Sequence, residues 1–312
     1  MTSYLKLFRW PNLVIIILSM SLVLFFIITP RLGTNLFIDG LSVFEFILLL
    51  ASTILIAIGG YIINDIFDIN TDSVNKQGKN VVGSKISIEA ANTLYWVTTV
   101  SGVLLGVLLS YLVNQINFGL IFLFSAGLLW FYSQKYQCQP LVGNIVIAFL
   151  SSISFGLVWL FEFYALSNNA EAFVDVQSNF PLVNRLVLIY MGFAFMTSLL
   201  REVVKDIEDY KGDNRYGCIT FTVKFGISAS NILALAIAYL SLFATIIIQY
   251  YFFIAGFIIL FITFLLIDIL FIITIIRLHS SITKLNYTKL SLLIKILMLV
   301  GILSMFMFYF EV

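Results

Sequence analysis

Long apolar runs recur along the whole chain and restrict it to folds that lie in a lipid bilayer. A helix needs about 20 apolar residues to cross the hydrocarbon layer, and nine runs come close to that length or exceed it. They lie near residues 13–30, 41–63, 88–113, 117–133, 141–165, 182–203, 228–252, 254–276 and 288–310. Because backbone polar groups in lipid must be satisfied within the spanning structure, these runs predict helices. We expect an all-α polytopic membrane protein whose nine helices form a single domain over residues 1–312.

The composition agrees with a membrane protein. The 312 residues are 61% hydrophobic and only 11% charged, which is more apolar surface than a soluble core of this length can bury. A net charge of +1 gives no reason to expect a nucleic-acid partner. Lys6 and Arg9 precede the first run, but no small-residue cleavage pattern follows it. The first run is therefore expected to be a retained helix and not a signal peptide.

Basic residues are distributed unevenly between the two predicted sides of the membrane. Of 17 Lys and Arg, 14 fall on the side of the N-terminus, only Arg31 and Arg185 on the other, and Lys295 within the last run. The 14 are Lys6, Arg9, Lys76, Lys79, Lys85, Lys135, Arg201, Lys205, Lys211, Arg215, Lys224, Arg277, Lys284 and Lys289. Basic connections face the cytoplasm, so we expect a cytoplasmic N-terminus, an external C-terminus and a place in the cell's inner membrane.

Acidic residues concentrate in two segments on that same side. Half of the 16 Asp and Glu are there, namely Asp65, Asp68, Asp72, Glu202, Asp206, Glu208, Asp209 and Asp213. Both segments contain the spacing D-x-x-D-x-x-x-D, and they lie four helices apart, which suggests two related helix quartets followed by a ninth helix. We call Asn64, Asp65, Asp68 and Asp72 the first acid cluster. We call Asp206, Asp209 and Asp213 the second acid cluster.

The spacing within each cluster places its members on one helical face. If the helices continue through them, the first cluster spans an arc of about 100° and the second, with Glu202, about 60°. Gly212 is a natural place for the second helix to end. Like charges at such spacing cost roughly 0.2–0.5 kcal/mol per exposed pair. A cation is therefore expected to compensate them.

Carboxylate oxygens suit magnesium, which proteins hold through one or two carboxylates together with water and substrate phosphates. Two acid clusters that face each other would hold a metal-bridged diphosphate between them. For one acidic loop alone, a solvated surface segment is the simpler interpretation. Matched spacing in two segments on one membrane face favours the site.

Several segments resemble the UbiA superfamily of intramembrane prenyltransferases. "NDIFDINTD" at residues 64–72 resembles its N-D-x-x-D-x-x-x-D motif, and "DIEDYKGD" resembles its second, aspartate-rich motif. "RWPN" before the first helix, "FYSQK" ending at Lys135 and "GNIVIAFLSS" starting at Gly143 also resemble family segments. The last three helices match only as hydrophobic spans. Where many members carry arginine and proline after the first motif, this chain has "NKQGKNVVGSK" with Lys79.

The resemblance implies a UbiA-type bundle with a central cavity open to the cytoplasmic side. It also implies magnesium-dependent transfer of a polyprenyl group from its diphosphate to an acceptor, with membrane lipid as the surroundings. The implied metal ligands are Asn64, Asp65, Asp68, Asp72, Asp206, Asp209 and Asp213, of which Asp68, Asp72, Asp209 and Asp213 are the expected catalytic carboxylates. The implied diphosphate-binding residues are Lys135, Tyr132, Lys79, Lys205 and Arg215. Arg9 is expected only to anchor the chain at the interface.

The acceptor remains open at this stage. "REVVKDIEDYKGD" most resembles the branch that alkylates a hydroxyl of a glycerol-phosphate lipid precursor, and Glu202 is a candidate base for that hydroxyl. An aromatic quinone precursor is the alternative acceptor within the family. A cation-coupled transporter is the alternative of another class, although transporters bind their substrates near the bilayer midplane.

Four further residues carry predictions of their own. Cys138 and Cys218 have neither metal-site spacing nor a disulfide pattern, so we expect both to stay reduced. Asp268 and Lys295 lie at similar depths in the last two runs, where an unpaired charge is expensive. We expect them to form an ion pair.

Overall fold

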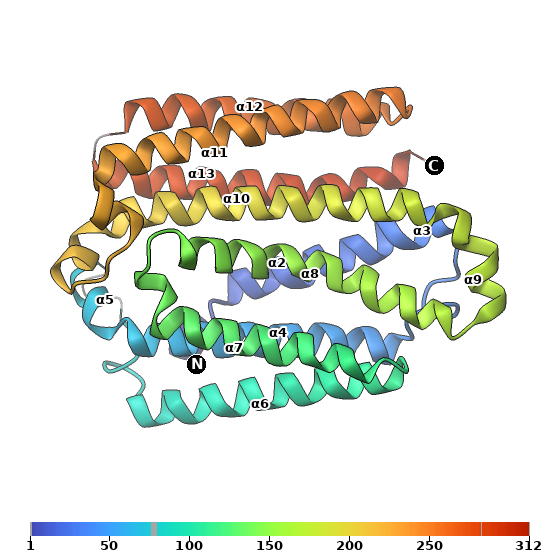
Figure 1. Cartoon of the computed structure of the whole chain (residues 1–312), viewed down its shortest axis with the longest axis horizontal. Coiled ribbons are helices and arrows are strands. Elements are labelled where there is room, and N and C mark those ends of the chain that lie inside the picture. Colours follow the sequence, from blue (N-terminus) through green and yellow to red (C-terminus); the bar gives the residue numbers. More distant parts are fainter. Residues whose placement is uncertain (1, 76–79, 282, 312) are drawn as a thin grey trace.

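The computed structural model describes residues 2–75, 80–281 and 283–311, and helices run along one common direction in it (Figure 1). Nine segments of this described part are long and apolar enough to cross a membrane, which confirms the predicted number. They are Trp10–Leu32, Val43–Phe67, Ile88–Leu112, Ile116–Gln134, Val142–Ser167, Ala170–Arg215, Phe221–Ile254, Ile258–Ser280 and Lys284–Phe310.

Within the described residues, thirteen α-helices build these segments and their connections. They are α1 (Thr2–Leu7), α2 (Trp10–Leu22), α3 (Thr29–Leu32), α4 (Val43–Phe67), α5 (Ile69–Asn75), α6 (Ile88–Leu112), α7 (Gly119–Gln134), α8 (Val142–Ser167), α9 (Ala170–Val176), α10 (Phe180–Arg215), α11 (Phe221–Ile254), α12 (Ile258–Ser280) and α13 (Lys284–Leu303). A π-helical stretch joins α2 to α3 within the first span, and a 3-10 helix prolongs α13. The short helix α9 was not predicted.

Helix starts follow the local sequence. Ser42 caps α4 by accepting a hydrogen bond from the backbone of Glu45, whose carboxylate accepts one from the backbone of Ser42 in return. Ser87 and Thr220 cap α6 and α11 in the simpler way, with the side chain alone. Inside α11, Gly226 has φ 88° and breaks the helix, so the seventh span proper begins close to the predicted residue 228.

The helix α10 is the centre of the bundle. It packs against α5, α8, α11 and α13. Its 36 residues correspond to about 54 Å of helix, which exceeds the roughly 30 Å of hydrocarbon. The helix does not end at Gly212, as the sequence suggested, but continues to Arg215. The whole second acid cluster therefore lies on regular helix.

Two glycines allow α4 and α6 to approach closely. A Cβ atom at Gly59 would come within 2.2 Å of Thr99 Oγ1, and one at Gly102 within 2.9 Å of Ile56 Cγ1. Small residues at helix contacts let backbones approach in membranes, where packing replaces the hydrophobic effect as the main attraction. This close pair fixes the end of α4, where the first acid cluster begins.

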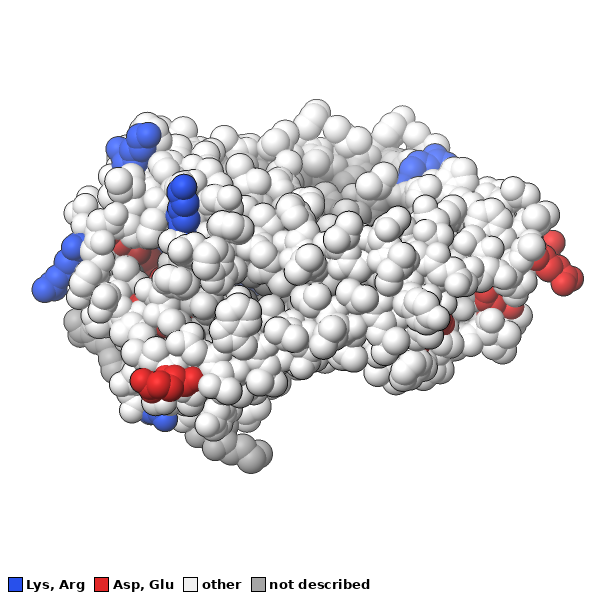
Figure 2. Space-filling model, turned by 60° about the horizontal axis from the view of Figure 1, so that its bottom comes forward, with Lys and Arg blue, Asp and Glu red and all other residues white. Residues whose placement is uncertain are grey.

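The two ends of the bundle carry different polar groups. Arg9, before the first span, contacts Asn64 at the end of the second. Arg31, in the last turn of the first span, donates to the carbonyl oxygens of Phe308 and Glu311. The C-terminus therefore lies at the end opposite Arg9, as an odd number of spans requires (Figure 1). Figure 2 shows charged side chains toward both ends of one face and uncharged side chains across its middle. Which end faces the cytoplasm stays a prediction.

The expectation of two reduced cysteines is wrong. Cys138 follows α7, Cys218 follows α10, and their sulfur atoms form a disulfide with a Cα–Cα distance of 4.6 Å. The two residues are 80 positions apart, and no pattern in the sequence shows that the α7–α8 and α10–α11 connections meet. Proximity that arises only from tertiary packing cannot be inferred from cysteine spacing.

The expected ion pair between Asp268 and Lys295 is wrong as well. Asp268 is buried and accepts a hydrogen bond of 2.6 Å from the Thr245 hydroxyl of α11. Lys295 interacts electrostatically with Arg201 and Glu202 of α10. No ion pair joins Asp268 to Lys295 in the described part of the chain. The prediction considered only how deep each residue lies in the membrane. It did not consider the direction in which each side chain points from its helix.

Candidate active site

The first acid cluster lies where a helix changes direction. The helix α4 ends at Phe67, Asp68 has φ −87° and ψ 4°, and α5 begins at Ile69. The backbone N–H of Asp68 donates to Asn64 O at 2.9 Å, and that of Asp72 donates to Asp68 O at 2.8 Å. The hydrogen-bond spacing of a helix thus persists across the bend. The straight helix assumed for the predicted arc is interrupted at Asp68.

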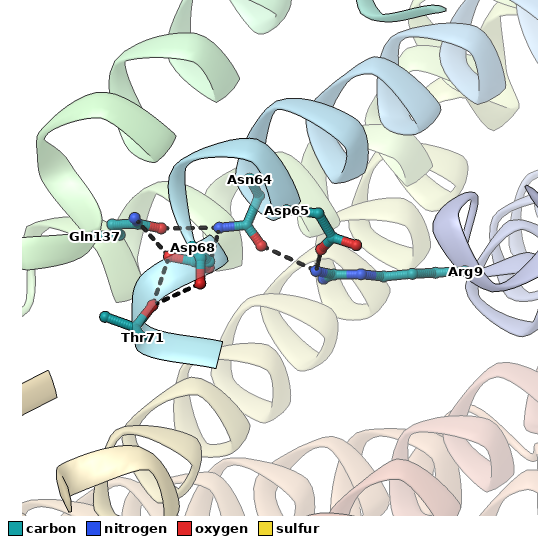
Figure 3. Close-up of polar contacts among 6 residues, drawn as sticks. All are labelled: Arg9, Asn64, Asp65, Asp68, Thr71 and Gln137. Atoms are coloured by element: carbon teal, nitrogen blue, oxygen red, sulfur yellow. Dashed lines mark hydrogen bonds and ion pairs between the residues drawn. The ribbon is translucent and has the colours of Figure 1, made fainter. Parts of the chain in front are cut away.

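A set of amide hydrogen bonds orients the Asp68 carboxylate (Figure 3). The Asn64 amide nitrogen donates to Asp68 Oδ2 at 2.8 Å, and Gln137 Nε2 donates to Asp68 Oδ1 at 3.0 Å. Asn64 Nδ2 also donates to Gln137 Oε1 at 2.8 Å, which closes the triangle. The Thr71 hydroxyl donates to the backbone carbonyl of Asp68. Gln137, on the connection after α7, is therefore part of the first acid cluster's surroundings.

Arg9 binds the other side of the same cluster, so its assignment as an interfacial anchor is wrong. Its Nη2 donates to Asn64 Oδ1 at 2.9 Å and forms an ion pair with Asp65 Oδ1 at 2.6 Å (Figure 3). The guanidinium lies 5.0 Å from the centre of the Tyr61 ring. Desolvation lowers the pKa of Arg9, but Asp65, Tyr61 and Asp68 together outweigh it and raise that pKa above its ordinary value. Arg9 is the first residue of "RWPN".

The second acid cluster is built on the unbroken last turns of α10. Asp206 Oδ2 accepts a hydrogen bond of 3.0 Å from the Asn144 amide, near the start of α8. One turn earlier, Glu202 is buried and forms an ion pair of 2.5 Å with Arg201. Lys205 interacts electrostatically with Glu202, and also with Asp209. Cationic side chains of α10 thus accompany the acidic side chains of this cluster.

The two acid clusters meet at one end of the bundle. The helix α5 packs against α10, and Figure 1 shows it beside the last turns of α10. The Ser73 and Tyr216 hydroxyl oxygens, one from each segment, are 3.4 Å apart. Asp213 interacts electrostatically with Asp209, Asp68 and Asp72. The segments that carry the two clusters therefore lie side by side at this end of the bundle.

The residues predicted to bind diphosphate fall into two groups. Tyr132 and Lys205 lie near the clusters, because Tyr132 is within electrostatic range of Lys205, Asp68 and Asp206. Lys135 and Arg215 are exposed at the edge of this end. Lys79 lies outside the described residues. The structure thus separates an inner pair of donors from an outer pair of cations.

The donor set fits magnesium. All candidate ligands are carboxylate or amide oxygens, which hard divalent cations prefer. Within residues 2–75, 80–281 and 283–311, no three His, Cys, Asp or Glu converge closely enough to hold a metal ion by themselves.

Two cavities of the described part lie beside the first cluster and deeper in the bundle. A space of about 10 Å³ is lined by Asp65, Asp72 and Asn80, among others. A second cavity of about 450 Å³ lies between α8, α10, α11 and α12, with Ser152, Gly192 and Phe271 in its wall. The predicted central cavity open to the cytoplasmic side stays a prediction.

Sequence reasoning missed three residues that touch the clusters. Arg9 and Asn144 lie within segments quoted for the family resemblance, "RWPN" and "GNIVIAFLSS", so a signal existed for both. No signal marks Gln137, an ordinary polar residue in a short connection. Its contact with Asp68 depends on where the α7–α8 connection lies in the fold.

Comparisons with known proteins agree with the family resemblance. The family model described as the UbiA prenyltransferase family matches residues 34–297. The digeranylgeranylglyceryl phosphate synthase of Sulfurisphaera tokodaii is 34% identical over 226 residues, which is 72% of each chain. The synthase of the same name from Methanobrevibacter smithii is 27% identical over 237 residues, 76% of this chain and 74% of that one.

Solved structures share the fold. A structure from a study of digeranylgeranylglyceryl phosphate synthase in membranes superimposes with a TM-score of 0.66 at 24% identity, covering 100% of this chain and 99% of that one. A UbiA homologue from Archaeoglobus fulgidus, bound to GPP and Mg²⁺, gives a TM-score of 0.59 at 16% identity, covering 97% and 99%. The same homologue was also solved with DMAPP and Mg²⁺. At these identities the likeness establishes the fold.

Proposed function

Because this chain belongs to the UbiA prenyltransferase family, we propose that it transfers a polyprenyl group from its diphosphate to a hydroxyl of a glycerol-phosphate lipid precursor. The protein is an integral membrane prenyltransferase, so the alternative of a cation-coupled transporter is set aside. The relatives named digeranylgeranylglyceryl phosphate synthase support the choice of acceptor and a geranylgeranyl chain as donor.

One observation carries the proposed site. The helix α5, which carries Asp72, packs against α10, which carries Asp213, and the Ser73 and Tyr216 hydroxyl oxygens are 3.4 Å apart. Magnesium held there would neutralise the diphosphate as charge develops on its oxygens, which is the main help that an allylic carbon–oxygen bond needs to break. Structures of a UbiA homologue contain Mg²⁺ together with prenyl diphosphates, which supports this assignment.

The proposed metal ligands come from both clusters. They are Asn64, Asp68, Asp72, Asp206, Asp209 and Asp213. Asp65 is ion-paired with Arg9, so we assign it a positioning part in which it holds Arg9 against Asn64. Asn144 and Gln137 orient Asp206 and Asp68 through the hydrogen bonds described above.

The chain's own donors then act on the diphosphate. Lys205 and Tyr132, near the clusters, donate hydrogen bonds to its oxygens. The allylic C–O bond breaks with its electron pair going to the diphosphate, and the acceptor hydroxyl oxygen supplies the pair for the new C–O bond. The hydroxyl proton goes to the departing diphosphate, because Glu202 is ion-paired with Arg201 and is a weak proton acceptor in that state.

A product assay tests this function. Purified protein is incubated with geranylgeranyl diphosphate, Mg²⁺ and either a geranylgeranylglycerol phosphate or an aromatic acid, and mass spectrometry identifies the product. We expect the ether product, with diphosphate released, and loss of both when EDTA is added. Prenylation of the aromatic acid alone would overturn the acceptor assignment. No diphosphate release with any acceptor would overturn the proposed function as a whole.

A further inference from the structure

The connection between α7 and α8 touches both acid clusters. Gln137 contacts Asn64 and Asp68 of the first cluster. Asn144, one residue after Gly143 at the start of α8, contacts Asp206 of the second. The short α7–α8 connection therefore contacts both clusters and can determine the distance between them.

A covalent bond ties this connection to the end of the second cluster. Cys138, the neighbour of Gln137, forms the disulfide with Cys218. The backbone N–H of Cys218 in turn donates to the carbonyl oxygen of Asp213 at 2.9 Å. An unbroken path, one disulfide and two hydrogen bonds long, runs from Asp68 through Gln137 to Asp213. We call it the disulfide link.

We propose that the disulfide link sets the separation of the two acid clusters, with Gln137 as a positioning residue for Asp68, and that reduction of the disulfide weakens divalent-metal binding. This inference rests on the proposed function, since it concerns the same site. Gln137 contacts both Asn64 and Asp68, so its displacement would free two groups of the first cluster together. Loss of such an outer partner typically weakens metal binding about 10–100-fold.

The location of the disulfide argues for a reversible bond. It lies at the end of the bundle that carries Arg9 and the acid clusters, which the basic residues predict to be cytoplasmic. Thiols in that compartment are kept reduced, and disulfides there are mostly transient or redox-sensing. A dithiol of the thioredoxin class would supply two electrons and two protons, leaving two thiols here and becoming a disulfide itself. Cys138 is half-buried, so part of the bond is within reach of solvent.

The first test establishes the redox state. The chain has two cysteines only, so every effect of a thiol reagent on the protein passes through this pair. Protein isolated from membranes is treated with a thiol-alkylating reagent before and after reduction, and its mass is measured. We expect no added mass before reduction and two added groups after it. Two added groups before reduction that persist after treatment with oxidised glutathione would overturn the proposal, because the disulfide would then not form.

The second test measures metal binding without relying on activity. Mn²⁺ is titrated into the full-length protein, and the free ion is counted by electron paramagnetic resonance. We expect binding about tenfold weaker after reduction with dithiothreitol and recovery on reoxidation. The Cys138→Ser variant should bind Mn²⁺ with the affinity of the reduced protein. Dithiothreitol should not change that affinity. If that variant does not fold, the reduced and reoxidised natural protein still gives the comparison.

Gln137 is tested in the same titration. Gln137→Leu removes both amide contacts and should weaken Mn²⁺ binding about 10–100-fold in either redox state. Gln139→Leu, a matched change in the same connection, should leave binding unchanged. Equal Mn²⁺ affinity in the oxidised, reduced and Gln137→Leu proteins would overturn the disulfide link. If the natural protein still releases diphosphate in that case, only the disulfide link is disproved and the proposed function holds. If it releases no diphosphate, the proposed function itself is disproved.

Discussion

The two acid clusters carry the same spacing but are held in different ways. The first lies on the bend between α4 and α5, where Arg9, Asn64 and Gln137 bind its carboxylates. The second lies on an unbroken helix at the centre of the bundle, with Asn144 as an amide partner. The geometry of the first cluster therefore depends on side chains from other segments. That of the second depends mainly on the continuity of α10.

The largest effect is expected from removing one carboxylate in either cluster. Asp68→Asn and Asp209→Asn should each lower turnover on the order of 100-fold or more, because each removes charge that stabilises the leaving diphosphate. Diphosphate release under saturating Mg²⁺ measures this. If both clusters contribute to one metal site, the two variants should lose similar amounts of turnover, although different contacts hold the two clusters in place.

Glu208→Gln is the matched control for these variants. Glu208 lies on α10 beside Asp209, but its carboxylate accepts a hydrogen bond from Thr288. The turnover of the Glu208→Gln variant should stay within about twofold of that of the natural protein, as expected for a surface substitution. Activity retained in both Asp68→Asn and Asp209→Asn, with folding intact by circular dichroism, would contradict the metal assignment.

A smaller but clear effect is expected at Lys205, a cation near the clusters. Lys205→Gln should raise KM for the prenyl diphosphate about 10–100-fold, because a charge-assisted hydrogen bond to a phosphate oxygen is lost from a partly desolvated place. Steady-state kinetics at fixed Mg²⁺ separate KM from kcat. An unchanged KM would place Lys205 outside the diphosphate site.

Arg9 tests whether the first cluster depends on its external partners. Arg9→Leu leaves Asp65 without its ion pair and should lower the free energy of unfolding by about 1–2 kcal/mol, since the pair is partly exposed. Thermal unfolding in detergent detects this change. Replacing both Arg9 and Asp65 by Leu should cost less than Arg9→Leu alone, because no charge is then left unpaired. A larger loss of unfolding free energy in the double variant would show that Asp65 makes another contact that stabilises the protein more than its ion pair with Arg9.

The smallest effect is expected from the two exposed cations at the edge of the site. Lys135→Gln and Arg215→Gln should each raise KM for the prenyl diphosphate roughly 2–5-fold and leave kcat unchanged, as for exposed charges screened by solvent. The effect should shrink as salt is added. A change in kcat for either variant would mean that its side chain reaches the diphosphate during turnover.

Much of the fold was predictable because it depends on local chemistry. The nine apolar runs have the length that a bilayer demands, and Ser42 with Glu45 carries a recognisable helix start. The acid clusters were visible because charge is rare in this chain and their spacing repeats. Regular helix also explains why Asp206, Asp209 and Asp213 share a face, as their spacing predicts.

The remaining features depend on which connections meet in space. Gln137, the Cys138–Cys218 disulfide and the hydrogen bond from Thr245 to Asp268 all join separate segments. Depth in the membrane follows from residue number along a helix, but the direction in which a side chain points follows from packing. The mistaken Asp268–Lys295 pair shows this difference directly, because its depth argument contained no information about rotation.

The central claim is that both acid clusters bind one metal-bridged diphosphate. A crystal structure with Mn²⁺ and a non-hydrolysable geranylgeranyl thiodiphosphate, with the metal located by its anomalous scattering, tests it most directly. We expect metal density between α5 and α10, with oxygens of Asp68 or Asp72 and of Asp209 or Asp213 at about 2.1 Å, near the distance for Mg²⁺. Metal bound by one cluster alone, with the diphosphate away from the other, would contradict the claim.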